Sequence, residues 1–159
     1  MDFEFGTALV AGLAGTAVMT AIMYMGFVMG MRMDMPMMLG TMFLRKGPAA
    51  WLLGIMIHFM MGAAFFVVYA ALFNALSLET SLAGWGAVFG LAHGVLAGMG
   101  MGMMGAMHPR LTPAGGGVAT DTLPAPGIFG IHVSAVAPMA ILGLHVAYGA
   151  VAGAVYTSV

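Results

Sequence analysis

The chain has 159 residues, of which 62% are hydrophobic and only 6% are charged, and its mean hydropathy is +1.06. A soluble domain of this size cannot hide so much apolar surface, so the composition predicts an integral membrane protein. The net charge of −1 gives no indication of a nucleic-acid partner. The absence of cysteine excludes disulfides and thiolate metal sites.

Four hydrophobic stretches are long enough to cross a bilayer, which takes about 20 residues of helix. The sequence therefore predicts an all-α integral membrane fold whose spans lie near residues 6–30, 50–73, 82–106 and 137–158.

The basic residues follow the first and third stretches, and they are Arg32, Arg45, Lys46 and Arg110. The positive-inside rule then places the connections 31–49 and 107–136 in the cytoplasm and both termini outside. We expect a multi-pass protein of a bacterial-type plasma (inner) membrane.

The connection after the first stretch carries signals for a short helix. Asp34 followed by Pro36 is a typical helix start, and the basic pair before Gly47 and Pro48 is a typical stop. The apolar residues between these signals are too few to span, so we expect a helix lying in the membrane interface. Residues 121–133 are expected to be its copy, with weaker signals because prolines and Gly130 interrupt them.

Glycines recur at a strict spacing of four in the third stretch, at Gly86, Gly90, Gly94, Gly98 and Gly102. This spacing puts them on one helix face, where a neighbouring membrane helix can approach closely. The first stretch has small residues at the corresponding places, which are Ala8, Gly12, Thr16 and Thr20. We therefore expect the first and third helices to cross through these small faces.

The two halves of the chain resemble each other. A shift of 78 residues superimposes the first stretch on the third and matches Arg32 with Arg110. A shift of 87 residues superimposes the later parts and matches Asp34 with Asp121, His58 with His145 and Tyr69 with Tyr156. We interpret the chain as a single membrane domain of tandem two-helix repeats, 6–73 and 84–159, with an inserted loop 112–120. Such repeats are related by a pseudo-two-fold axis along the membrane normal.

The matched histidines are the sharpest functional signal. His58 and His145 each begin the pattern His-x₃-Gly-x₆-Tyr, whose polar positions share one helix face. Polar groups inside a membrane usually face the bundle and often mark function. Two symmetric imidazoles suit axial ligation of haem b. We predict that the two histidines form one site. The alternative is that they do not meet and that each bonds a neighbouring helix.

The chain has twenty methionines, and many of them lie in two clusters, one after the first span and one at the end of the third. Thioethers suit Cu(I), and Met101, Met104 and His108 are the candidate ligands. Methionine is also a flexible apolar filler, which is the competing interpretation. His93 lies near the middle of the membrane, where we expect it to bond Thr16 or Thr20.

Several stretches, GLAGTAVMTAIMYMGFVMGM, IHFMMGAAFFVVYA, MMGAMHPR and LHVAYGAVAGAVY, resemble an uncharacterised family of small duplicated four-helix bacterial membrane proteins with a domain of unknown function. The resemblance covers most of the chain and implies the four-helix membrane architecture without an active site.

The sequence contains no Ser-His-Asp order, HExxH motif or phosphate loop, so an enzyme is not expected. The leading hypothesis is a non-enzymatic accessory or scaffold subunit, acting as a homo-oligomer or in a larger membrane complex. The alternatives are a haem-containing or redox-associated subunit, a Cu(I)-handling protein, and a small transporter with a midplane site near His93.

Overall fold

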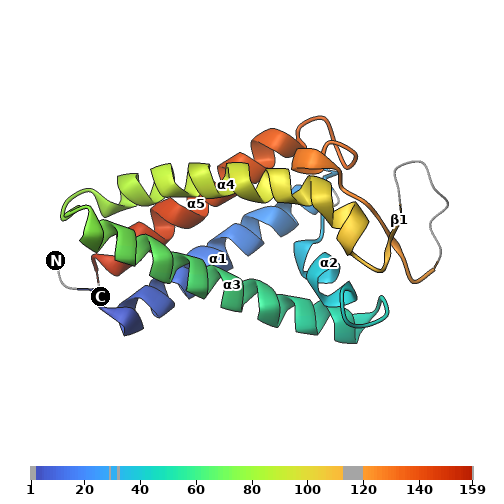
Figure 1. Cartoon of the computed structure of the whole chain (residues 1–159), viewed down its shortest axis with the longest axis horizontal. Coiled ribbons are helices and arrows are strands. Elements are labelled where there is room, and N and C mark those ends of the chain that lie inside the picture. Colours follow the sequence, from blue (N-terminus) through green and yellow to red (C-terminus); the bar gives the residue numbers. More distant parts are fainter. Residues whose placement is uncertain (1–2, 29, 32, 113–119, 159) are drawn as a thin grey trace. The chain divides into compact units, whose positions relative to one another are not determined.

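The structure, a computed structural model, describes residues 3–28, 30–31, 33–112 and 120–158. Five α-helices account for most of the described chain (Figure 1). The elements in chain order are α1 (Phe5–Val28), α2 (Met35–Thr41), α3 (Pro48–Ala75), α4 (Leu82–Met107), β1 (Leu111–Thr112), β2 (Leu123–Pro124), the 3₁₀ helix η1 (Ile128–Gly130) and α5 (Ala137–Tyr156).

Four of the helices, α1, α3, α4 and α5, are long and apolar enough to cross a membrane, with 24, 28, 26 and 20 residues. The four predicted stretches are thereby confirmed, and the finding indicates a multi-pass membrane protein. Proline sets two of the helix starts: Pro48 is the first residue of α3, and Pro138 lies in the first turn of α5. Proline is tolerated there because the first N–H groups of a helix have no partner within the helix.

The long helices contribute to two compact units, which are described separately. Unit 1 comprises the described residues of 1–22, 59–94 and 142–159. Unit 2 comprises those of 23–58 and 95–141.

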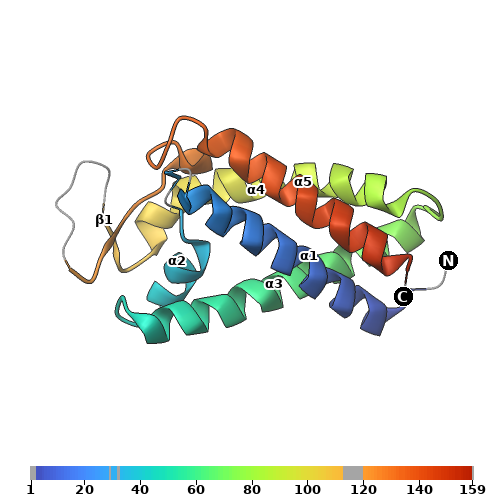
Figure 2. The same cartoon turned by 180° about the vertical axis from the view of Figure 1, so that it is seen from behind.

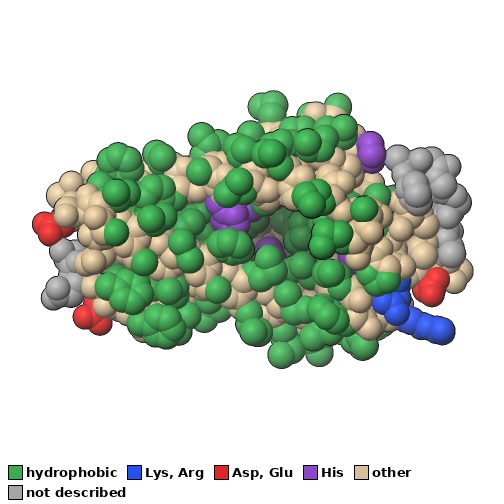
Figure 3. All heavy atoms as spheres, viewed as in Figure 1, with side chains coloured by type: hydrophobic (Ala, Val, Ile, Leu, Met, Phe, Trp, Pro, Cys, Tyr) green, Lys and Arg blue, Asp and Glu red, His purple; other side chains and the backbone are tan. Residues whose placement is uncertain are grey.

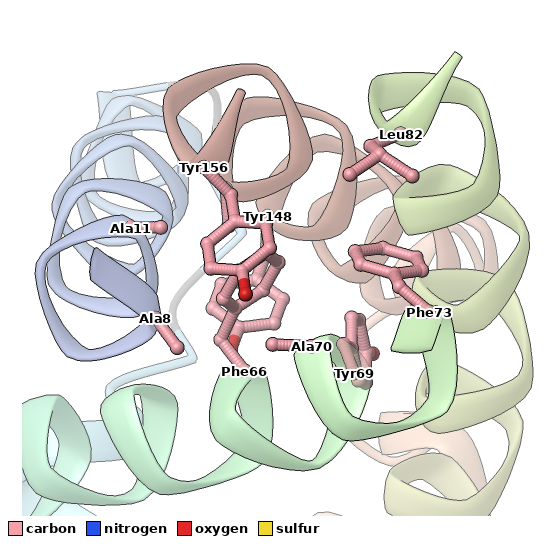
Figure 4. Packing of buried hydrophobic residues seen from close by; sticks show 10 residues of the cluster. Ala8, Ala11, Phe66, Tyr69, Ala70, Phe73, Leu82, Tyr148 and Tyr156 are labelled. Atoms are coloured by element: carbon pink, nitrogen blue, oxygen red, sulfur yellow. The ribbon is translucent and has the colours of Figure 1, made fainter. Parts of the chain in front are cut away.

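The core of unit 1 is aromatic. Phe66, Tyr69 and Phe73 of α3 meet Tyr148 and Tyr156 of α5, and Figure 4 shows these rings gathered beside two alanines of α1. Several pairs adopt the edge-to-face arrangement that aromatic quadrupoles favour, such as Phe66 with Tyr156 at a centroid distance of 5.7 Å. In this core the small residues of α1 leave room for large rings from α3 and α5.

Close backbone approaches in unit 1 identify the partner of each glycine face. A Cβ atom added at Gly12 of α1 would lie 2.8 Å from the Cα of Ala63 in α3. Added at Gly86 or Gly90 of α4, it would collide with a backbone carbonyl of α5. The unit 1 part of the glycine face of α4 therefore packs against α5, whereas Gly98 and Gly102 in unit 2 lie against η1. The predicted crossing of α1 and α4 through their small faces is wrong. A spacing of four defines a face but does not identify the helix that covers it.

Unit 2 contains α2, which lies beside the first turns of α3 in both views (Figures 1 and 2). Gly40 of α2 abuts the backbone of Ala50, and Gly54 of α3 abuts the backbone of Pro36. The short helix is confirmed, and Asp34 caps it by accepting a hydrogen bond from the Met37 N–H at 2.9 Å. Its location in the membrane interface stays a prediction.

The connection between α4 and α5 differs from α2. The predicted copy at 121–133 is not an α-helix: it forms β2, which pairs in parallel with β1, and the three-residue η1. Its prolines cannot donate backbone hydrogen bonds, and Gly127 and Gly130 adopt positive φ values of 71° and 70° that end a helix. Most of the predicted inserted loop, 113–119, lies outside the described residues.

Candidate functional site

A cluster of two histidines and a tyrosine lies within unit 1. The rings of His93 in α4 and His145 in α5 have centroids 4.8 Å apart and planes inclined by 71°. The hydroxyl of Tyr69 in α3 lies 3.1 Å from Nδ1 of His93, within hydrogen-bond distance. Phe65 covers another side of His93, with a centroid distance of 4.1 Å. Three spanning helices thus bring polar groups together in apolar surroundings.

The glycine face of α4 explains why the two imidazoles meet. Gly90 lies against the backbone carbonyl of His145, and a Cβ at Gly94 would lie 3.1 Å from the Cβ of His145. Small residues let α4 and α5 approach closely. His93, next to Gly94 in the chain, is thereby held within ring contact of His145.

The prediction that His93 bonds Thr16 or Thr20 is wrong. The hydroxyls of Thr16 and Thr20 each bond a carbonyl four residues earlier in α1, both at 2.7 Å. This back-bonding is common for threonine inside helices. His93 instead uses Tyr69, because α4 packs beside α3 and α5 in this unit.

The predicted His58–His145 site joins residues of different units. His58 belongs to unit 2 and is buried, with 8% of its surface exposed, whereas His145 belongs to unit 1. Within unit 1 the ring of His145 contacts that of His93, a pairing that was not predicted. Haem ligation by His58 and His145 stays a prediction.

The two methionine clusters meet in unit 2. Met33, which precedes α2, and Met101 of α4 are both buried and belong to one apolar cluster. Met35 and Met104 pack against it, as does the aliphatic side chain of Val133. Residues from both predicted clusters are therefore brought together, including two of the three candidate copper ligands. Met29, which belongs to the first methionine cluster, and the nearby Arg32 lie outside the described residues.

His108, the third candidate ligand, holds the end of α4 to α2. Its Nδ1 accepts a hydrogen bond from the Arg110 backbone N–H at 3.1 Å, so this nitrogen carries no proton. Its Nε2 therefore carries the proton and donates to the Met38 carbonyl at 2.8 Å. The Arg110 guanidinium also donates to the Thr41 carbonyl at 2.9 Å. In this arrangement both ring nitrogens are engaged by protein groups.

A second polar network in unit 2 was not predicted from the sequence. The Tyr24 hydroxyl donates to the capping carboxylate of Asp34 at 3.1 Å and accepts from the Trp51 indole N–H at 2.7 Å. The network ties the end of α1 and the start of α3 to the cap of α2. No sequence periodicity relates these three residues, so only the fold identifies their contact.

Many large apolar side chains of the described residues are exposed. Figure 3 shows hydrophobic side chains spread over much of the face in view, with few charged groups. Methionines are prominent on this surface, among them Met139 with 79% of its surface exposed and Met107 with 71%. Such a surface suits contact with lipid tails or with apolar faces of other membrane proteins.

Chemically, the described residues offer two kinds of ligand. Neutral imidazoles suit first-row transition ions and proton exchange, and thioethers suit soft ions. Within the described part of the chain, no three residues of His, Cys, Asp and Glu gather closely enough to hold a metal ion.

No protein-family model matches the chain. Neither the curated proteins nor the solved structures contain a match to it.

Proposed function

We propose that this protein is a non-enzymatic accessory or scaffold subunit of a bacterial-type plasma membrane, which assembles with copies of itself through α5. The observation that carries the proposal is a face of small residues on α5 that the rest of the described chain leaves partly or wholly uncovered. This face consists of Gly143, Ala147, Ala150 and Ala154, spaced at four, three and four residues. We call it the α5 small face.

Small residues favour association of membrane helices because they let two backbones approach and gain contacts that lipid cannot supply equally well. Gly143 has nothing within 4 Å of the position that a Cβ would occupy. In contrast, the glycine face of α4 is already occupied by α5 within unit 1. The α5 small face is therefore the better candidate for a contact with a second copy.

The proposal includes the predicted topology, with both termini outside, the connections 31–49 and 107–136 in the cytoplasm, and two tandem repeats. Two contacts in unit 1 support the duplication. Gly15 of α1 meets Ala152 of α5, where an added Cβ would lie 3.0 Å from the alanine Cβ. The shift of 78 residues between the repeats relates Gly15 to His93, and the shift of 87 residues relates Ala152 to Phe65. His93 and Phe65 are themselves in ring contact.

The test is a pair of matched glycine substitutions, Gly143→Leu in α5 and Gly84→Leu in α4. Both sites are open, so neither variant should change the unfolding free energy of one chain by much. Native mass spectrometry from detergent micelles should show oligomers for the wild type and Gly84→Leu, and monomers for Gly143→Leu. A monomeric wild type without a co-purifying partner would refute the proposal, and an oligomeric Gly143→Leu would refute the role of α5.

A second candidate function, Cu(I) handling, is favoured by the meeting of the two methionine clusters. Four thioethers, those of Met33, Met35, Met101 and Met104, contribute to one cluster, and two of these residues are buried. Soft, uncharged ligands in a dry environment suit a soft monovalent ion. We propose a thioether site that leaves His108 in its hydrogen bonds with Met38 and Arg110.

Copper titration decides this second candidate. The protein is titrated with Cu(I) under reducing conditions against a chromogenic Cu(I) chelator. The double variant Met33→Leu/Met101→Leu preserves apolar volume, which cores tolerate, and should abolish stoichiometric binding. Met139→Leu, at an exposed site, is the matched control and should bind as the wild type does. Equal binding by the double variant would show that methionine there is only apolar filler.

A further inference from the structure

We propose that His93 and His145 form an intramembrane site for a divalent first-row transition ion, such as Zn²⁺ or Cu²⁺. This site is separate from the methionine cluster, because its ligands are imidazoles of unit 1 and the ions it suits are harder than Cu(I). The proposed scaffold function implies neither the pairing of these two imidazoles nor a metal ion at this place.

The separation of the rings fits a shared ion. With a metal–nitrogen bond of about 2.0–2.1 Å, an imidazole centroid lies about 3.2 Å from the metal. Two such ligands at an angle of about 90–110° have centroids about 4.5–5.2 Å apart, by the same bond length. The observed distance between His93 and His145 is 4.8 Å. Ligands on opposite sides of an ion would be about 6.4 Å apart, so this pair does not suit axial haem ligation or linear coordination.

Tyr69 supplies the support that a metal-binding histidine usually has. Such a histidine generally gives its second ring N–H to an acceptor, which fixes its tautomer and orientation. The Tyr69 hydroxyl lies 3.1 Å from Nδ1 of His93. If it accepts the Nδ1 proton, the lone pair of Nε2 is left for the ion. Phe65 packs against the same ring at 4.1 Å and limits its rotation.

The surroundings suit reversible binding. Both imidazoles are partly exposed, and no third His, Cys, Asp or Glu joins them in the described chain. Two protein ligands leave further coordination positions on the ion unfilled by the chain. Polar groups placed at this depth in spanning helices commonly mark an ion or proton pathway.

The probe is Cu²⁺, and the readout is electron paramagnetic resonance of the protein in detergent after removal of any affinity tag. Nitrogen hyperfine splitting from two imidazoles, at one ion per chain, is the expected result. His93→Asn and His145→Asn should each remove one nitrogen from the spectrum. Tyr69→Phe should keep both nitrogens and weaken affinity by about 10–100-fold, as loss of a supporting group typically does.

The matched control is His132→Asn, because His132 is exposed and lies in the connection before α5. It should change neither stoichiometry nor spectrum. A wild-type spectrum without two nitrogens overturns the site even if the histidine variants fail to fold. Unchanged binding in both folded histidine variants overturns it equally, and loss of the signal in His132→Asn would show adventitious surface binding only.

Discussion

Replacing Gly12 by alanine tests the packing of α1 on α3 most directly. The added methyl would lie 2.8 Å from the Cα of Ala63, and 2.9 Å from both the Gly62 carbonyl oxygen and the Phe66 Cβ. Ordinary contacts of a Cβ begin at 3.4 Å, so α1 and α3 must part locally by the difference, 3.4 − 2.8 = 0.6 Å. Two of the three obstacles are backbone atoms, which cannot rotate away.

The expected loss of stability follows from this separation. A radial gap of about 0.5–1 Å forfeits a quarter to a half of each dispersion contact across the interface. Overpacking of this kind typically destabilises by about 1–3 kcal/mol. Alanine recovers up to about 1 kcal/mol through its greater helix propensity. We expect a net destabilisation of about 1–2 kcal/mol, a factor of roughly 5–30 in the folded-to-unfolded ratio.

The measurement is reversible unfolding in mixed detergent micelles, followed by circular dichroism during titration with a denaturing detergent. Gly6→Ala is the matched control, because Gly6 lies in the same helix and has nothing within 4 Å of the added atom. If Gly12→Ala is as stable as Gly6→Ala, the close approach of α1 and α3 does not exist and the packing described for unit 1 is refuted.

Two further predictions concern polar side chains that hold helices in place. Asp34→Ala removes the cap of α2 together with the acceptor of the Tyr24 hydroxyl, and loss of the cap should cost about 1 kcal/mol. Hydrogen exchange should quicken in residues 35–41, and unchanged exchange there would contradict the capping role. Tyr148→Phe removes the hydroxyl that donates to the Gly62 carbonyl at 2.5 Å, and should lower the unfolding free energy by about 0.5–1.5 kcal/mol; no loss in the same detergent titration would show that this bond adds nothing net.

The spans were predictable because their signal is local and strong. A stretch of some twenty apolar residues has few alternatives to a membrane helix, and the observed helices end within a few residues of the predicted limits. The same holds for α2, since a capping carboxylate and an early proline act within one turn. At 121–133 the interrupting prolines and glycines outweighed the likeness to α2, and no α-helix forms.

The polar sites could be predicted only in part. His58 and His145 stand out by their matched spacing, and the methionine clusters stand out by composition. The contact of His93 with His145 depends on which helix covers the glycine face of α4, and that face was predicted to pack against α1. If the glycine face of α4 had been assigned to α5, the next long helix in the chain, the contact between His93 and His145 would have been predicted.

The sequence by itself determined the four spanning helices, the capped helix α2 and which faces are small enough for close packing, because these depend on hydropathy, local hydrogen bonding and helical periodicity. Only the tertiary structure decided that Gly86 and Gly90 meet α5, that Gly12 meets α3, and that His93 lies beside His145 and Tyr69. The reason is physical: in a membrane all outer faces are similarly apolar, so the choice of partner depends on the shapes that meet across the contact, and those shapes involve residues far apart in the chain.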